Sequence, residues 1–563
     1  GTLDIKSGAT FRGLASSRVG TLTGSGTLVM EAGALTAGGA NTDSTFSGTI
    51  EGAGGLVKTG TGTLTLSGML YYTGTTTIES GTLKIGDATG IMSDYFESTI
   101  VNNGALIIDA RGTTGSFFYK GDAGISGTGS LTKEGDNFAD LGDAHTHTYA
   151  GPTTVNGGVL RGAIANDAAL TLANGTTSFY MRGASRFGSL HGTGTIRMFG
   201  GDLTVGSDDT STTFGGMILS ISGSGLVKTG SGTLTLTGQL FYNGTTTING
   251  GTLRLGDATG LTTLAFPSTI VNNSQLVIDT TTRNFAYNAS AGSSGTGSLT
   301  VMGGNMASIG LGNTYSGATT IDGGVLRGQI DSEGALTIAA GAEFRAMQSS
   351  RFGALAGNGL LTIEAGDLTI DGNAGSTFGG TITGAAGSGL IKNGAGTLTL
   401  TGNSTYTGPT TINAGVLEVN GSLLSAAVVN NGGTLMGSGT VGGVDVQSGG
   451  VLAPGNSIGT LTVDGDATFR AGSVFRVEAD DAGNADLLDV DGKVTINGGT
   501  VDVRATGAAY DTAIQYTILN ATDGVSGKFT NVTTDLAFLS PTLNYDANSV
   551  YLTLIKGGNY CDV

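Results

Sequence analysis

The segment Leu56–Gly90 decides the fold, because its sequence, LVKTGTGTLTLSGMLYYTGTTTIESGTLKIGDATG, recurs along the chain. Nearly the same letters return at Leu226–Gly260 as LVKTGSGTLTLTGQLFYNGTTTINGGTLRLGDATG. A third copy begins at Leu390 as LIKNGAGTLTLTGNSTYTGPTTINAGVLEV. The interval from Leu56 to Leu226 is similar to that from Leu226 to Leu390, but the two are not equal. Internal repeats of this kind predict one structural unit that stacks on copies of itself.

Within each copy the smallest unit is an apolar–polar–apolar triplet such as Leu64-Thr65-Leu66, bounded by Gly, Asn or Asp. Alternation with period two predicts strands with one buried face, and the bounding glycines predict turns with positive φ. Such closely spaced strands leave no room for helical crossovers, and the strands of a β-sandwich are longer. We therefore predict an all-β chain, a right-handed parallel β-helix with about three short strands in each coil of roughly 20–25 residues. No helix longer than two turns is expected before about residue 555.

Composition excludes several other classes. The chain has 104 glycines but 5 prolines, and charged residues make up 12% of it. Collagen needs abundant proline, and disorder needs much charge and few β-branched residues. A net charge of −18 leaves no basic surface for phosphates, so no nucleic-acid partner is expected. Cys561 is the only cysteine, which excludes an internal disulfide.

Aromatic residues return at the same places in the copies. They are Phe46, Phe214 and Phe378 in one row, and Tyr72, Tyr242 and Tyr406 in another. Rows of this kind predict stacked packing in the core or at its rim, with a ligand-stacking row as the alternative. Threonines at the outward positions of TLTL and TTTI are expected to pair with their neighbours one coil away.

One polar cluster has metal-ligand character. Asp143, His145 and His147 lie in DLGDAHTHTYAGPTT, together with Asp140, and His-x-His beside carboxylates is a donor set that zinc accepts. The alternative is a solvated protruding loop, because residues 143–146 are interpreted as a four-residue insertion relative to IGLGNTYSGATT. We favour the loop and predict no metal, cofactor or catalytic site. His191 replaces Ala356 of the next copy and is interpreted as surface variation.

Two acidic groups near the C-terminal end are further candidates. Asp486, Asp489 and Asp491 in DLLDVDG lack the order and the closing Glu of a calcium loop. Asp480 and Asp481 are expected in a hinge-like turn rather than as the paired carboxylates of a glycosidase.

The repeat resembles a known family. The pattern G-x-L-x-K-x-G-x-G-T-L-x-L-x-G, followed by Y-x-G-x-T-T-I-x-x-G-x-L-x-V, is similar to the autotransporter-associated β-strand repeat of passenger domains. The sequence from Gly449 resembles the last coils of AIDA-type passengers, and Tyr516–Leu554 is similar to the capping element of that family. The implied organisation is a β-helix over 1–420, final regular coils over 421–476, a cap or autochaperone-like region over 477–556, and the start of a linker over 557–563.

The resemblance implies a surface-exposed adhesin or self-association stalk, exported through the periplasm and the outer membrane. Its partners would be a host surface, extracellular matrix or copies on neighbouring cells, besides its own outer-membrane β-barrel translocator. Residue 1 falls inside a repeat, so we expect further sequence upstream. Two other hypotheses remain open: a stalk for, or part of, a glycan-degrading or other secreted enzyme, and an ice- or surface-binding β-helix that uses rows of threonine.

Overall fold

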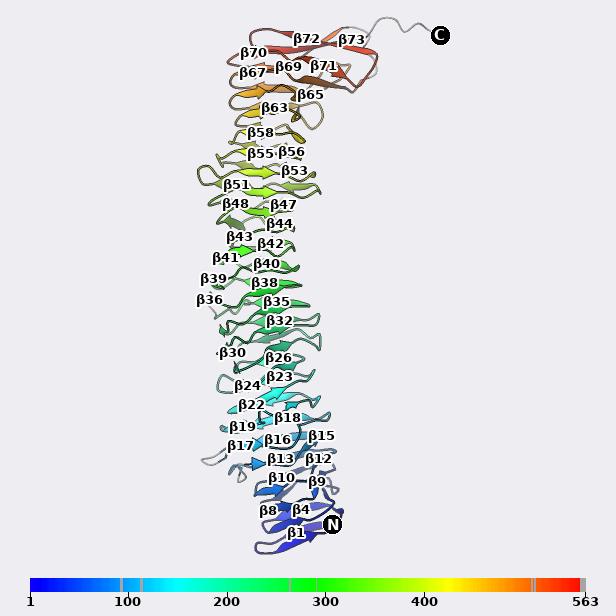
Figure 1. Cartoon of the computed structure of the whole chain (residues 1–563), viewed down its shortest axis with the longest axis vertical. Helices are drawn as coiled ribbons and strands as arrows, with labels where there is room; N and C mark the ends of the chain where they lie inside the picture. Colours follow the sequence, from blue (N-terminus) through cyan, green and yellow to red (C-terminus); the bar gives the residue numbers. More distant parts are fainter. Residues whose placement is uncertain are drawn as a thin grey trace, which may run out of the picture. The chain divides into compact units, whose positions relative to one another are not determined.

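The computed structural model describes residues 1–91, 95–111, 115–262, 265–289, 291–507, 510 and 513–556. The chain divides into two compact units, Gly1–Ser290 and Ala291–Val563. Every regular element in the described residues is a β-strand of two to eight residues (Figure 1). No helix in this part of the chain is long and apolar enough to cross a membrane.

A coil of the first unit illustrates the architecture. It runs through β32 (Thr233–Leu236), β33 (Leu240–Phe241) and β34 (Thr246–Ile248) before β35 (Thr252–Leu255) begins the next coil. Thr233 of β32 faces Thr252 of β35 in a parallel pair, so one turn of the coil extends from the first of these residues to the second. Strands at the β32 position form sheet 1, those at the β33 position sheet 2, and those at the β34 position sheet 3, and each pairs with its counterparts in neighbouring coils.

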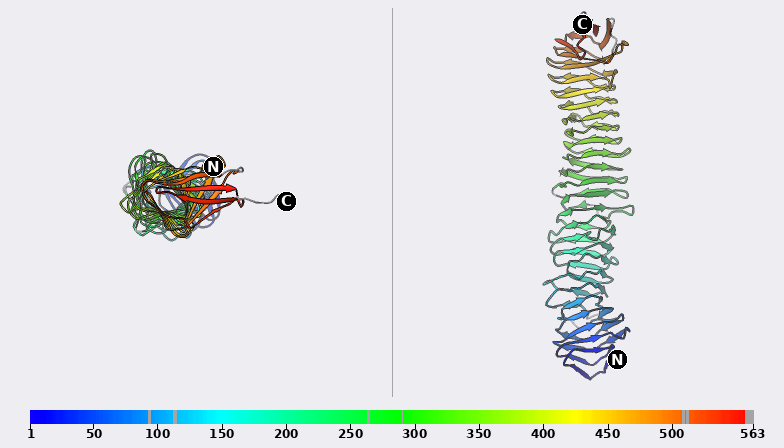
Figure 2. Two further views of the ribbon diagram at one scale, coloured as in Figure 1. Left: turned by 90° about the horizontal axis from the view of Figure 1, so that it is seen from above. Right: turned by 90° about the vertical axis from the view of Figure 1, so that its right-hand side faces the viewer.

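The second unit repeats this design in its own coils. There β53 (Thr397–Leu400), β54 (Asn403–Ser404) and β55 (Thr410–Ile412) make one coil, and β56 (Gly415–Val419) pairs in parallel with β53. Figure 2 shows the same stacking of short strands within each unit. The prediction of an all-β parallel β-helix is therefore confirmed.

Coil length is not constant. In the first unit Thr153 has Leu170 as its partner in the next coil. In the second unit Thr500 has Asn531 as its partner, so that coil contains many more residues. A regular ice-binding array needs a fixed coil spacing and outline, so this variation argues against the ice-binding hypothesis.

The core lies inside the coils because alternate residues point inward. In β10 (Thr63–Leu66) the leucines are buried and the threonines are partly exposed. Inward and outward residues alternate in the same way in sheet 2 of the first unit. From Tyr95 onward the strands of this sheet are β14 (Tyr95–Phe96), β17 (Phe117–Tyr119), β19 (Phe138–Asp140), β22 (Val159–Ile164), β24 (Ser178–Met181), β27 (Thr195–Met198), β30 (Met217–Ser220) and β33. One face of each strand therefore belongs to the core and the other to the surface.

Glycine serves two different purposes at the corners of the coils. Gly251 has a φ of +59°, which is the turn conformation that the sequence predicts. Gly402 has no such φ, but a Cβ there would lie 2.0 Å from the carbonyl oxygen of Gly380, one coil away. Close approach of stacked backbones, which the turn pattern does not predict, thus accounts for part of the glycine content.

Pairing changes at the C-terminal end of the second unit. Parallel pairing continues through β68 (Thr500–Ala505) and β71 (Asn531–Thr534). By contrast, β73 (Ser549–Lys556) runs antiparallel to both β69 (Ile514–Ala521) and β72 (Leu539–Tyr545) (Figure 1). The segment 477–556 thus contains both parallel coils and this antiparallel group, whereas residues 557–563, including Cys561, lie outside the described residues.

Candidate binding surface

The repeated aromatic rows belong to the core. Phe46, Phe214 and Phe378 are fully buried, and so are the rings of Tyr72, Tyr242 and Tyr406. They present no ring face to a ligand. The core interpretation of both rows is therefore confirmed, and the ligand-stacking alternative is wrong.

Each of these tyrosines takes part in a buried hydrogen bond that the letters alone did not reveal. The Tyr72 hydroxyl lies 2.7 Å from Oγ1 of Thr76, which in turn lies 2.7 Å from Oγ of Ser98 in the next coil. The same tyrosine–threonine pair, four residues apart, recurs as Tyr149–Thr153, Tyr242–Thr246, Tyr315–Thr319 and Tyr406–Thr410. The first threonine of T-T-I thus points inward, and the constant spacing of Tyr and Thr is the signal that could have revealed it.

Buried lysines form a second recurrent feature. Nζ of Lys228 donates to the carbonyl oxygens of Thr229, Gly230 and Gly250, and burial lowers its pKa. Lys58 and Lys133 make the same three contacts in their own coils, and Lys392 makes two of them. Burial lowers the pKa of Lys133 to about 8. Because each ammonium is buried and donates to two or three carbonyls, it stabilises a corner and is not placed to react with a substrate.

His147 is a core residue. Its Nδ1 accepts the N–H of Ile125 at 2.9 Å, and its Nε2 lies 3.0 Å from the carbonyl oxygen of Leu141. Burial lowers the pKa of His147 to about 4, so the ring is neutral near pH 7. Asn313 makes the equivalent contact in the second unit, accepting the N–H of Ser293 at 2.9 Å. Both nitrogens of His147 are thus engaged by the backbone.

His145 and Asp143 lie apart from His147, on the surface. Asp143 is exposed and pairs with Arg182 at 3.3 Å. Both His145 and Asp143 line a pocket of about 480 Å³ whose other polar side chains include Lys120, Asp122 and Asp140. In the described residues no group of three or more His, Cys, Asp or Glu side chains is placed to hold a metal ion.

The register corrects the length of the insertion here. Asp140 faces Arg161 and His147 faces Ile164. In the second unit the corresponding pairs are Ser308 with Arg327 and Asn313 with Ile330. Six residues thus stand where the later copy has four, so the insertion adds two residues and the expected four was wrong, because the later copy also bulges here and contains part of the extra length.

The C-terminal carboxylates do not converge. Asp486 is buried and accepts the N–H groups of Gly459 at 2.9 Å and Glu478 at 2.7 Å, whereas Asp489 and Asp491 are exposed. Burial raises the pKa of Asp486 to about 7. Asp480 accepts the N–H groups of Ala482 and Asn484 within its own turn, as the sequence predicts. His191, on β26 (Leu190–Gly192), is partly exposed.

The outward faces carry ladders of hydrogen-bonding side chains. In the second unit Asn413 donates to Asn393 at 2.8 Å and Asn430 donates to Asn413 at 2.6 Å, one coil apart each time. In the first unit Asn273 donates to Asn249 at 3.3 Å, close to the outward Thr247. Pairs of threonines on adjacent coils occur at other triplets, such as Thr383 with Thr362 at 3.1 Å and Thr21 with Thr2 at 2.8 Å, whereas the pairing expected at TLTL and TTTI stays a prediction.

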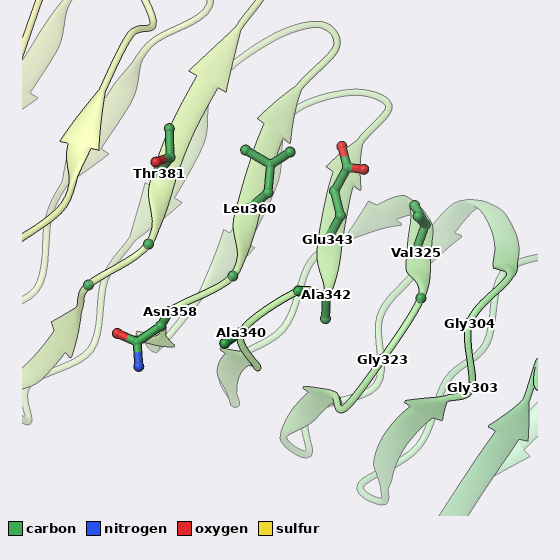
Figure 3. Close-up of a pocket in the computed structure, with 15 residues that line it drawn as sticks. Gly303, Gly304, Gly323, Val325, Ala340, Ala342, Glu343, Asn358, Leu360 and Thr381 are labelled. Atoms are coloured by element: carbon green, nitrogen blue, oxygen red, sulfur yellow. The ribbon is translucent and has the colours of Figure 1, made fainter.

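A groove of about 720 Å³ lies in the second unit. Its walls are mostly glycine backbone, with Val325, Glu343, Leu360 and Thr381 on successive strands (Figure 3). The carboxylate of Glu343 already accepts from Arg345 at 2.8 and 2.9 Å and from Thr362 at 2.8 Å. The groove therefore offers shape and backbone hydrogen-bonding groups, which suit contact rather than chemistry.

The sequence profile of one family matches the chain at five places. The family is described as the Passenger-associated-transport-repeat, and the matches are residues 56–85, 141–161, 226–255, 293–327 and 390–419. Each match contains one buried tyrosine–threonine pair. The hydrogen-bonded pair is therefore part of what defines the repeat in this chain.

Several known proteins are similar to long stretches of the chain. The Adhesin BmaC autotransporter of Brucella suis biovar 1 (strain 1330) is 34% identical over 627 residues, which cover 88% of this chain and 18% of that protein. Two proteins from Serratia marcescens, each named Extracellular serine protease, are 42% identical over 161 residues and 38% identical over 162 residues. Each of those matches covers 27% of this chain and 15% of the relative. The chain thus spans less than a fifth of the length of these relatives.

The chain also aligns with a solved structure, the crystal structure of the Haemophilus influenzae Hap adhesin. The alignment covers 94% of this chain and 64% of the Hap adhesin chain, with a TM-score of 0.40 and 15% sequence identity.

Proposed function

We propose that the chain is an adhesive segment of an autotransporter passenger and binds through many weak polar contacts. Its five passenger-associated transport repeats and its similarity to an autotransporter adhesin support this proposal. As a passenger segment it is exported to the cell surface or beyond. Its partner would be a host surface, extracellular matrix or the same protein on a neighbouring cell, and an outer-membrane translocator would deliver it. The relative named as an adhesin, similar over 88% of this chain, supports the adhesive role.

The observation that carries the proposal is the repetition of outward hydrogen-bonding groups from coil to coil. The asparagine ladder Asn393–Asn413–Asn430 shows the principle: Asn393 and Asn430 each use one amide group in the ladder and Asn413 uses both, and each amide can form further hydrogen bonds. Equivalent groups along many coils multiply weak contacts through avidity. Function would then be spread along the coils instead of depending on one residue.

The test compares single with multiple substitutions on bacteria that display the chain. Asn249→Ala or Thr247→Ala alone should weaken adhesion or aggregation less than about twofold, whereas Asn393→Ala, Asn413→Ala and Asn430→Ala together should weaken it at least about tenfold. Protease resistance of each variant controls for folding. Loss of adhesion from one substitution in a folded chain would refute the distributed model.

A second candidate function is a stalk that holds an enzyme. The two serine proteases of Serratia marcescens that match 27% of this chain favour it, because their similarity to this chain covers only 15% of each. On this hypothesis the catalytic residues lie outside the matched segment, and the chain itself contributes no catalysis. Incubating the purified chain with casein and with labelled glycans tests this. Turnover by the purified chain would overturn the non-catalytic assignment.

A further inference from the structure

Sheet 2 of the first unit carries a row of outward aromatic side chains. The row consists of Tyr95 on β14, Phe118 on β17, Phe138 on β19, Tyr180 on β24 and Phe199 directly after β27. Tyr95 is 49% exposed and Phe138 is 41% exposed, and the other three are partly exposed. Ring centroids are 5.9 Å apart for Tyr95 and Phe118, 6.4 Å for Phe138 and Tyr180, and 5.5 Å for Tyr180 and Phe199. These five residues are called the aromatic strip.

The fold does not require the aromatic strip, as the second copy of the repeat demonstrates. Register places Ala265, Ala286, Met306, Arg345 and Glu364 at the equivalent outward positions. The inward aromatics of the same strands are retained, since Phe96, Phe117, Tyr119 and Phe179 correspond to Phe266, Phe285, Tyr287 and Phe344, all buried. The core therefore needs its rings in both copies, whereas the surface has them in one.

Cations accompany the rings. Nζ of Lys120 lies 3.9 Å from the ring centre of Tyr95, and the guanidinium of Arg197 lies 5.2 Å from that of Tyr180. Arg161 and Arg182 lie 5.9 Å from the rings of Phe138 and Phe199. Arg161 also pairs with Asp140 at 3.2 Å and Arg182 with Asp143. Within the described residues Lys120 and Arg197 form no ion pair. Nε of Arg197 is buried, whereas the exposed side chain of Lys120 leaves its ammonium for a ligand.

The pocket of about 480 Å³ opens beside the strip. Phe118 supplies an apolar wall, and Lys120, Asp122, Asp140, Asp143 and His145 supply polar groups. Two of these, Asp143 and His145, come from the segment that is two residues longer than its counterpart in the later copy. The same copy of the repeat therefore combines the aromatic strip, the unpaired cations and this pocket.

We propose that the aromatic strip and this pocket form a binding site for an extended glycan. Sugar rings have apolar C–H faces that stack on aromatic rings, and a rim of hydroxyls that donate to carboxylates and accept from ammonium and guanidinium groups. The strip crosses six strands, or about 24 Å at the usual strand spacing, which suits an oligosaccharide better than a single sugar. Rings on adjacent strands, Tyr95 with Phe118 and Tyr180 with Phe199, provide stacking partners for successive sugars.

The charge balance favours a glycan over a single-stranded nucleic acid. Stacking rings suit both ligands, but a phosphate backbone needs an excess of cations. Here Asp122, Asp140 and Asp143 offset most of the charge of Lys120, Arg161, Arg182 and Arg197, and the whole chain carries −18. The site goes beyond the proposed adhesive role of the polar ladders and stands independently of it.

The experiment applies the purified chain to an array of neutral and acidic oligosaccharides. The test variant introduces the residues of the second copy: Tyr95→Ala, Phe118→Ala, Phe138→Met, Tyr180→Arg and Phe199→Glu. The matched control is Phe241→Ala, which removes an exposed ring of the same sheet two strands beyond β27. Circular dichroism and protease resistance report folding, and labelled single-stranded DNA and cell aggregation are measured in parallel.

We expect the unmodified chain and Phe241→Ala to bind a common set of glycans. Tyr180→Ala alone should weaken binding about threefold to tenfold, and the five-residue variant should abolish it while remaining folded. Absence of glycan binding by the unmodified chain, or equal binding by the five-residue variant, overturns the proposal. Loss confined to DNA binding would assign the strip to nucleic acid, and loss confined to aggregation would assign it to a second copy of the chain. Either of those two results also overturns the glycan site, and none of these results bears on the polar ladders.

Discussion

The hydroxyl groups of Tyr242 and Thr246 lie 2.9 Å apart in the core of the first unit, and Thr246 lies 2.7 Å from Oγ of Ser268 one coil away. Thr246 therefore links the turn that follows β33 to the next coil. Tyr242 depends on Thr246 for its hydrogen bond, whereas Thr246 retains Ser268 if the phenol is removed. The two partners of this bond are therefore not equivalent.

This asymmetry predicts different costs for two conservative substitutions. Tyr242→Phe should destabilise the coil by about 1 kcal/mol, because Thr246 keeps a partner. Thr246→Val should cost about 2–3 kcal/mol, because it leaves the buried hydroxyl of Tyr242 unpaired. Hydrogen exchange of the amides in β33–β35 measures both changes locally. Equal costs, or the reverse order, would show that the pair does not carry this coupling.

Gly402→Ala should destabilise the second unit by about 1–3 kcal/mol or more, because stacked backbones leave no room for a methyl group. The added Cβ would lie 2.0 Å from the carbonyl oxygen of Gly380. Gly304→Ala is the matched control, since its Cβ would meet nothing within 4 Å. Urea-induced unfolding compares the two variants. Equal urea midpoints for the two variants would mean that neighbouring coils can move apart to admit a methyl group at little cost in unfolding free energy.

The burial of His147 predicts that the surrounding part of the first unit loses stability in acid. The unfolded chain binds a proton on this ring near pH 6.5, whereas the folded chain does so only near pH 4, because burial lowers the pKa. Lowering the pH from 6.5 to 4 therefore favours the unfolded state, by about 3 kcal/mol at most. Protease resistance at pH 4.5 and pH 7.5 should reveal this loss.

His147→Asn should remove that pH dependence, because Asn313 forms the same backbone contact in the second unit and does not titrate between these pH values. His191→Asn, on the outer surface, serves as the control substitution. If His147→Asn leaves acid sensitivity unchanged, other groups cause it.

The antiparallel strands at the C-terminal end should protect the second unit from aggregation. Leu552 on β73 is buried and Thr553 beside it is partly exposed. Leu552→Asp places a charge in the core and should cause aggregation, whereas Thr553→Asp should be tolerated. Truncation after residue 476 should have the same effect as Leu552→Asp, because it exposes unpaired strand edges. Light scattering and limited proteolysis test these outcomes, and a soluble, protease-resistant truncation would contradict the capping role.

Much of the architecture was predictable because the repeat and the period-two alternation are local signals. Leu64 and Leu66 face inward and Thr63 and Thr65 outward, as the alternation requires. The sequence showed that Asp143, His145 and His147 lie close together in the chain, but not which of these side chains point into the core. His147 turned inward as the buried position of β20 (Thr146–His147), whereas His145 stayed at the surface because it precedes this strand and its alternation does not include it.

The sequence by itself determined that this chain forms coils of short strands with one buried face, because one face of every strand must leave water, and it favoured burial of the repeated aromatic rows. The tertiary structure alone decided which side chains meet across coils. Thr246 meets Ser268, and Phe138 meets Tyr180, although neither pair is close in sequence. The physical reason is that stacking brings together residues one or two coils apart, and coil length varies, so no fixed spacing reveals these contacts. The contacts of the buried lysines and of the aromatic strip also join residues of different coils, so the tertiary structure was needed to identify them.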